Sequence, residues 1–128
     1  MVGLVIVSHS QKLAEGVVEF SRLISGECPM AAAGGLDDGS FGTSYEKIEA
    51  AIESVYSDDG VAVIMDLGSS CMTTEMVIED MEDRKVSMLD CPLVEGAVLA
   101  AVESTGGITL ADLAVKIKEA YAVRKFPA

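Results

Sequence analysis

Apolar residues along this chain form short unbroken runs, and these runs alternate with segments in which apolar residues recur at helical spacing. The first run covers residues 2–7 and ends at the polar residues 8–10. An apolar run without polar alternation is typical of a strand buried on both faces, as in a parallel sheet between helices. Similar runs at residues 29–33, 61–65 and 86–89 bring the number of predicted strands to four.

Five helices are predicted between and after these strands, because apolar residues there repeat every three or four positions. We expect them over about residues 11–24, from Thr43 to the turn at 58–60, from Ser69 or Ser70 to about Glu82, from Pro92 to the break at 105–107, and from Thr109 to near Tyr121. Apolar residues are expected on the buried faces of the first four helices. They are Leu13, Ala14, Val17, Val18 and Ile24 in the first helix, Tyr45, Ile48, Ile52 and Val55 in the second, Met72, Met76, Val77 and Met81 in the third, and Val94, Val98, Ala101 and Val102 in the fourth.

Residues suited to helix ends support these boundaries. Thr43 and Glu46 have the spacing of a capping box, in which a hydroxyl and a carboxylate satisfy the first N–H groups of a helix. Pro92 suits the first turn of a helix, where its missing N–H costs nothing. Basic residues complement the dipole at the end of the last helix; they are Lys116, Lys118, Arg124 and Lys125.

The alternation of strands and helices predicts an α/β fold with three layers. We expect a doubly wound, mainly parallel sheet of about four strands, flanked by about five helices. The expected strand order is 2-1-3-4, because the first and third strands of a doubly wound sheet are neighbours. Residues 1–128 are expected to form a single domain, since this length supports one core and we find no linker or internal repeat.

Composition and charge restrict the classes of partner. Asp and Glu number 21 against 9 Lys and Arg, so the net charge is −12, which disfavours nucleic acids and anionic membrane surfaces. No signal peptide and no apolar run of about 18 residues is visible, so we expect a cytoplasmic protein without a membrane span. Cys28, Cys71 and Cys91 show no C-x-x-C pairing, and we expect buried, reduced thiols and no metal site.

Three loops follow predicted strands and should meet at the carboxyl edge of the sheet: residues 8–10, 34–44 and 66–70. Each joins glycine or hydroxyl residues to the start of a helix, and helix N-termini attract anions of phosphoryl size. The residues expected to cradle a phosphoryl group are Ser10, Gly35, Thr43, Ser44, Gly68, Ser69 and Ser70. For Thr43 and Ser70, simple helix capping is the alternative. No loop matches a Walker or dinucleotide fingerprint, so no cofactor is expected in this chain.

His9 is the only histidine, and it stands at the end of the first predicted strand. Many lone histidines are structural, but one facing an anion-binding edge is suited to nucleophilic phosphoryl transfer through an imidazole nitrogen. Such a nucleophile needs its other ring nitrogen protonated and held. Asp66, at the end of the third strand, could accept that N–H, although an ordinary turn or cap aspartate is the alternative.

Five sequence segments together resemble the mannose-type IIA family of the phosphotransferase system. They are residues 5–10 with 14–16, 34–39, 42–44, 66–70 and 93–97, in the order in which the family has them. The Asp-Leu-Gly-Ser sequence at 66–69 resembles the branch that serves the phosphoenolpyruvate-dependent dihydroxyacetone kinase.

The resemblance implies specific roles and partners. His9 matches the family's histidine that is phosphorylated on Nε2, and Asp66 matches the carboxylate that orients it. The donor would be the histidine-containing phosphocarrier protein. The acceptor would be ADP held on the nucleotide-binding kinase subunit. Because this chain stops at Ala128, we expect its donor to act in trans, and the family implies a homodimer.

Two other functions remain to be weighed. The first is the IIA component of a mannose-type sugar transporter, which shares the fold and the histidine. The second is a receiver-like signalling module, because Asp66 ends a third strand. Receivers need an acidic pair after the first strand, where this chain has Ser8 and His9, so the second reading is disfavoured.

Overall fold

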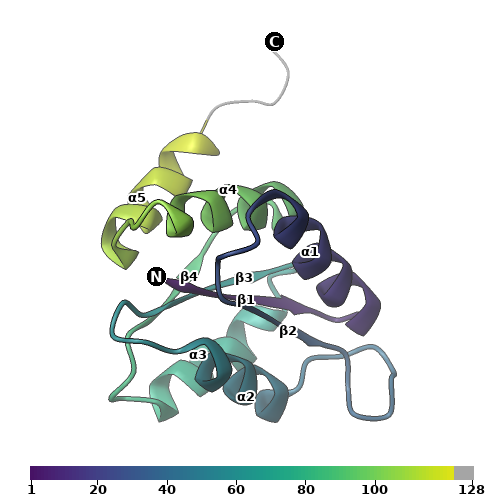
Figure 1. Cartoon of the computed structure of the whole chain (residues 1–128). Coiled ribbons are helices and arrows are strands. Elements are labelled where there is room, and N and C mark those ends of the chain that lie inside the picture. Colours follow the sequence, from purple (N-terminus) through teal and green to yellow (C-terminus); the bar gives the residue numbers. More distant parts are fainter. Residues whose placement is uncertain (123–128) are drawn as a thin grey trace.

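The structure, a computed structural model, describes residues 1–122 and has a parallel sheet between two layers of helices (Figure 1). Its elements, in chain order, are β1 (Gly3–Ser8), α1 (Gln11–Ile24), β2 (Met30–Gly34), α2 (Tyr45–Val55), β3 (Val61–Met65), α3 (Ser70–Asp80), β4 (Val86–Leu89), α4 (Leu93–Thr105) and α5 (Leu110–Ala120). The four strands are ordered β2-β1-β3-β4, and the predicted α/β fold is therefore confirmed.

The strand register brings the ends of β1 and β3 together. Val7 lies opposite Met65, and the Asp66 N–H donates to the Val7 carbonyl at 3.1 Å. On its other edge β1 pairs with β2 as far as Ser8 and Gly34. β1 and β2 each lie one residue further along than predicted, because backbone pairing continues past the end of the apolar run.

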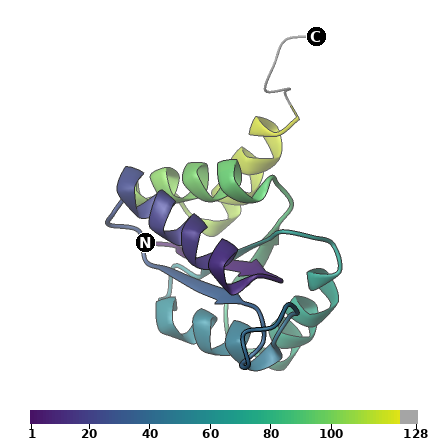
Figure 2. The ribbon, with the colours of Figure 1, turned by 90° about the vertical axis from the view of Figure 1, so that its right-hand side faces the viewer.

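The sheet has a separate aliphatic core on each face. Helices α1, α4 and α5 cover one face, and α2 and α3 cover the other (Figures 1 and 2). The fully buried side chains with the largest volumes are all Leu, Ile or Val, as expected of a chain without tryptophan. None of the helices in residues 1–122 combines the length and apolar character that a membrane crossing requires.

Helix α4 buries small residues where larger ones were predicted. Its buried positions are Gly96, Ala97, Ala100, Ala101 and Ser104. Val94 and Val102 are 42% and 44% exposed, so their prediction as core residues was wrong. The reason is close approach: a Cβ added to Gly96 would lie 2.3 Å from Cys91 Sγ. Only small side chains fit on the face that packs against the rest of the fold.

Two other helices bury hydroxyl residues in place of predicted apolar ones. Helix α1 buries Ser21, and α3 buries Ser70 and Thr74. The predicted core residues that the structure exposes are Leu13, Ile24, Met72 and Met76. The prediction placed apolar residues inward by their hydrophobicity alone. Where helices pack closely, however, small polar side chains also fit on the buried face.

Several helix ends and side chains also differ from prediction. Ser44, not Thr43, is the N-cap of α2, because the Thr43 hydroxyl lies against Ser70 instead. Pro92 is the N-cap of α4 and precedes its first turn, and α3 ends at Asp80, short of Glu82. Arg124 and Lys125 lie outside the described residues.

The three cysteines are free, but only one of them is buried. Cys28 lies in the core and its burial raises the pKa of its thiol. Cys71 and Cys91 are partly exposed, which corrects the prediction of three buried thiols. Burial and the neighbouring Asp90 raise the pKa of Cys91 to about 11.

Candidate functional site

His9 is held at the carboxyl edge of the sheet by its backbone. It follows the last residue of β1, and its N–H donates to Asp66 Oδ2 at 3.0 Å. Its carbonyl accepts from the Gly42 N–H at 3.0 Å, which ties the long loop after β2 to the same edge. The imidazole keeps 28% of its surface exposed, so the ring is both fixed and reachable from solvent.

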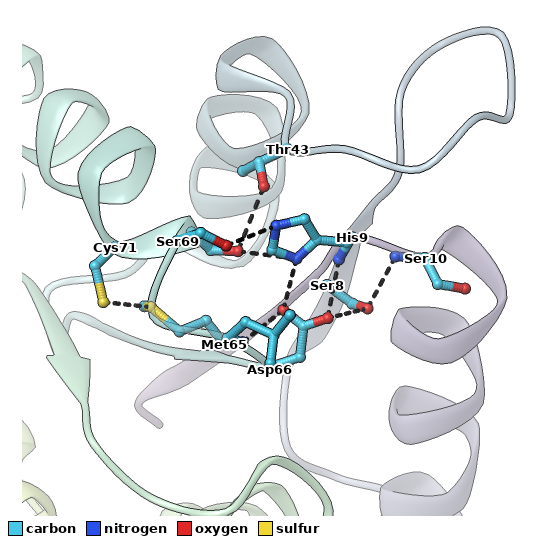
Figure 3. A network of polar contacts seen from close by, with 10 residues as sticks. Ser8, His9, Ser10, Thr43, Met65, Asp66, Ser69 and Cys71 are labelled. Atoms are coloured by element: carbon cyan, nitrogen blue, oxygen red, sulfur yellow. Dashed lines mark hydrogen bonds and ion pairs between the residues drawn. The ribbon is translucent and has the colours of Figure 1, made fainter.

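Asp66 lies directly beside the imidazole (Figure 3). Its Oδ1 is 3.1 Å from His9 Nδ1 and also accepts from the Leu67 N–H at 2.8 Å. Its Oδ2 accepts from the Ser8 hydroxyl at 2.8 Å. Burial alone would raise the pKa of the Asp66 carboxyl, but these hydrogen bonds outweigh it and hold the pKa below its usual value. The group is therefore an ionised acceptor at neutral pH.

This contact determines the tautomer of His9. An ionised carboxylate can only accept, so the hydrogen of the neutral imidazole belongs on Nδ1. The lone pair is then on Nε2, where the Ser69 hydroxyl lies at 3.0 Å and can donate to it. A fixed Nδ1–H and a lone pair at a partly exposed Nε2 are the requirements for nucleophilic attack by imidazole.

Two of the predicted cradle residues complete the surroundings of the ring. Ser70 Oγ is 3.5 Å from His9 Nδ1, and Thr43 Oγ1 is 3.4 Å from Ser70 Oγ. Ser70 is also the first residue of α3, so the positive end of this helix dipole lies at the imidazole. Negative charge added at the ring would be favoured there.

The other cradle residues have structural contacts away from the ring. The Ser10 and Ser44 hydroxyls cap α1 and α2, and the Ser10 hydroxyl points away from the imidazole (Figure 3). Gly35 has a φ of +65° in the turn after β2, a conformation that favours glycine. Gly68 accepts the Cys71 N–H in the turn that leads into α3. Their contribution to phosphoryl binding stays a prediction.

Ser8 is a residue of the site that sequence reasoning did not single out. It is fully buried, and its hydroxyl contacts the carboxylate that holds His9. The only signal in the sequence is a hydroxyl residue where the first apolar run ends, and such residues are common at strand ends. The contact depends on Asp66, 58 positions away, and is therefore invisible without the fold.

Exposed apolar side chains and an open cavity adjoin the site. Phe41, Leu67 and Met72 are 80%, 60% and 74% exposed; Phe41 precedes Gly42, Leu67 follows Asp66, and Met72 lies in the first turn of α3. The cavity has a volume of about 400 Å³ and extends from Asp66 toward the end of β4. Within residues 1–122 no group of three or more His, Cys, Asp and Glu side chains is placed to hold a metal ion.

Comparison with known proteins identifies the family. The model of the family EIIA-man, described as "PTS system fructose IIA component", matches residues 3–114. The phosphoryl donor subunit DhaM of the PEP-dependent dihydroxyacetone kinase of Escherichia coli is 44% identical over 114 residues, 84% of this chain and 24% of that protein. The phosphotransferase subunit DhaM of the PTS-dependent dihydroxyacetone kinase of Lactococcus lactis is 36% identical over 107 residues, 84% of this chain and 85% of that protein.

A solved structure supports the fold. The phosphotransferase system component EIIA from Streptococcus agalactiae superposes with a TM-score of 0.72 at 19% identity, over 98% of both chains. This chain spans about a quarter of the length of the Escherichia coli relative and most of the Lactococcus lactis one. With the family match covering residues 3–114, the chain belongs to the PTS system fructose IIA component family.

Proposed function

We propose that this chain is a phosphohistidine carrier, a phosphotransferase subunit that serves a dihydroxyacetone kinase. One observation carries the proposal: Asp66 Oδ1 lies 3.1 Å from His9 Nδ1, which leaves the lone pair on Nε2 of a ring that is 28% exposed. The two relatives named as dihydroxyacetone kinase subunits support the choice of kinase.

The transfer itself needs only the imidazole and its carboxylate. The Nε2 lone pair of His9 attacks the phosphorus of a phosphohistidine on the donor, a Nε2–P bond forms, and the donor's N–P bond breaks with its electron pair returning to the donor nitrogen. Asp66 stabilises the positive character that develops on the ring. In the second step a terminal oxygen of ADP attacks the same phosphorus and the Nε2–P bond breaks.

The partners follow from the family and from what this chain lacks in sequence. The donor is the histidine-containing phosphocarrier protein. The acceptor is ADP bound on the nucleotide-binding subunit of the kinase, because no loop of this chain matches a nucleotide-binding fingerprint. A homodimer belongs to the same proposal.

The first prediction is that phosphoenolpyruvate, enzyme I and the phosphocarrier protein together add one acid-labile phosphate to this chain. His9→Ala should abolish the labelling, because the chain holds no second histidine. Radioactive transfer and intact-mass measurement at neutral pH check it, with circular dichroism as the folding control. Labelling of a folded His9→Ala variant would contradict the proposal.

A second function is favoured by the family description itself, which names a fructose IIA component. A IIA component of a mannose-type sugar transporter would use His9 in the same way but would pass its phosphate to a permease-associated protein. The phosphorylated chain should therefore be offered separately to the ADP-loaded kinase subunit and to a transporter IIB component. Loss of phosphate only to the IIB component would select the transporter.

A further inference from the structure

The hydroxyl of Ser8 connects the first turn of α1 to the Asp66 carboxylate. It accepts from the Ser10 N–H at 3.0 Å and donates to Asp66 Oδ2 at 2.8 Å (Figure 3). Ser8 is fully buried at the end of β1, so water does not compete for this hydroxyl. The phosphoryl transfer described above assigns it no role.

The direction of these two hydrogen bonds is determined by chemistry. The Ser10 N–H can only donate, so it occupies a lone pair of the Ser8 oxygen. The ionised carboxylate can only accept, so the Ser8 hydrogen points at Asp66 Oδ2. Ser8 and the His9 N–H thus hold Oδ2 from two directions, and this leaves Oδ1 facing His9 Nδ1.

We propose that Ser8 is a positioning residue for phosphoryl transfer, acting through Asp66 on the orientation and tautomer of His9. The proposal rests on the proposed function of His9. Without the Ser8 hydroxyl, the carboxylate keeps only the backbone N–H groups of His9 and Leu67, and it is held less firmly against Nδ1. The contact that keeps the imidazole hydrogen on Nδ1 is then weakened.

The protonation of Asp66 provides an independent readout. His9 is the titratable group in contact with Asp66, and Cys71, Asp90 and Cys91 line the adjoining cavity. The hydrogen bond from Ser8 is one of those that hold the Asp66 pKa low. Removing it raises that pKa. The Asp66 carboxyl should therefore titrate at higher pH in the variant than in wild type, and this is measured on the carboxyl itself.

The decisive experiment measures phosphate acquisition by Ser8→Ala and Ser8→Cys at neutral pH, at several concentrations of donor. We expect a maximal rate lower on the order of 10-fold, the loss that corresponds to one hydrogen bond to a charged group, with the KM for the donor unchanged. The titration of the Asp66 carboxyl should move to higher pH. Ser8→Cys keeps the shape of the side chain with a weak donor, so it separates hydrogen bonding from packing.

Ser104→Ala is the matched control. Ser104 is also fully buried, but its hydroxyl donates to the Val2 carbonyl, away from the carboxyl edge. It should lose stability without a change in rate or in the Asp66 titration. A wild-type rate and a wild-type Asp66 titration in a folded Ser8→Cys variant would overturn the proposal, as would the same changes in Ser104→Ala.

The Asp66 titration separates this proposal from the proposed function. Carbon-13 NMR follows the Asp66 carboxyl in wild type and Ser8→Ala without any phosphoryl transfer. If wild type takes no phosphate on His9, the proposed function fails. An unchanged Asp66 titration in the variant overturns the role of Ser8, whatever His9 does.

Discussion

At the scale of single residues, Asp66 determines what the site can do. Its two oxygens have separate tasks: Oδ2 accepts from the His9 backbone and the Ser8 hydroxyl, and Oδ1 faces His9 Nδ1. One side chain therefore fixes both where the imidazole lies and which of its nitrogens carries hydrogen. Only 14% of the Asp66 side chain is exposed, so solvent weakens these bonds little.

Asp66→Asn should slow phosphate acquisition by about 10- to 1000-fold. An asparagine amide can donate to Nδ1 and so favour the tautomer with hydrogen on Nε2, which cannot attack phosphorus. Docking of the donor should change less than the rate of the transfer step, because positioning and charge provide most of this catalysis. Single-turnover transfer from the phosphorylated donor checks it.

Asp83→Asn controls for the loss of one negative charge. Asp83 is 83% exposed, and its carboxylate pairs with Arg84 in the turn before β4. Its variant should transfer at the wild-type rate. A wild-type rate in a folded Asp66→Asn variant would instead reduce Asp66 to a turn residue.

At the scale of elements, the site depends on how closely β2 approaches α1. Gly34, the last residue of β2, faces the start of that helix. A Cβ added there would lie 2.6 Å from the Ser10 carbonyl oxygen and 2.7 Å from Gln11 Cα. Both neighbours are backbone atoms that follow His9 directly, so they cannot give way without moving the site.

Gly34→Ala should therefore destabilise the protein by about 1–3 kcal/mol, the usual cost of forcing extra volume into a packed region. Gly16→Ala is the matched comparison, because Gly16 lies within α1 and has open space where its Cβ would be. It should stabilise by about 0.5–1 kcal/mol, since glycine is a poor helix former. Urea unfolding of both variants checks the pair. Equal stability of Gly34→Ala and wild type would contradict the close approach.

At the scale of the whole molecule, the net charge of −12 governs encounter with partners. The exposed apolar residues near the site are uncharged, so electrostatic steering of an approaching partner must come from the acidic residues around them. Helix α3 begins at Ser70, beside His9, and carries Glu75 and Glu79 on its exposed surface. A donor and an acceptor with basic docking surfaces suit this field.

Association with such partners should slow as salt rises, because ions screen exposed charges over about 10 Å at 0.1 M. Stopped-flow association rates at several ionic strengths check it. Glu75→Gln on α3 should flatten the salt dependence more than Glu119→Gln on α5, since α3 starts beside the site and α5 does not. Rates indifferent to salt would remove electrostatic steering from the account.

The sequence by itself determined the framework of this protein. The four strands, five helices and the order β2-β1-β3-β4 were predicted, with ends within a few residues. The reason is physical: strand and helix periods are local properties, and parallel strands joined by helices have few allowed arrangements. The same rules place His9 and Asp66 at one edge of the sheet, and their roles in transfer stay predictions.

The tertiary structure alone decided which side chains meet. The sequence shows several similar serines near His9, yet only Ser69 and Ser70 reach the ring, Ser10 caps a helix, and Ser8 binds the carboxylate. The contacts of Ser8, Ser69 and Ser70 join residues about 60 positions apart, so they depend on how the strands and helices are placed in space. The small residues on the buried face of α4 were likewise decided by the tertiary structure. Close packing is a property of two surfaces together, so the sequence of one segment does not predict it.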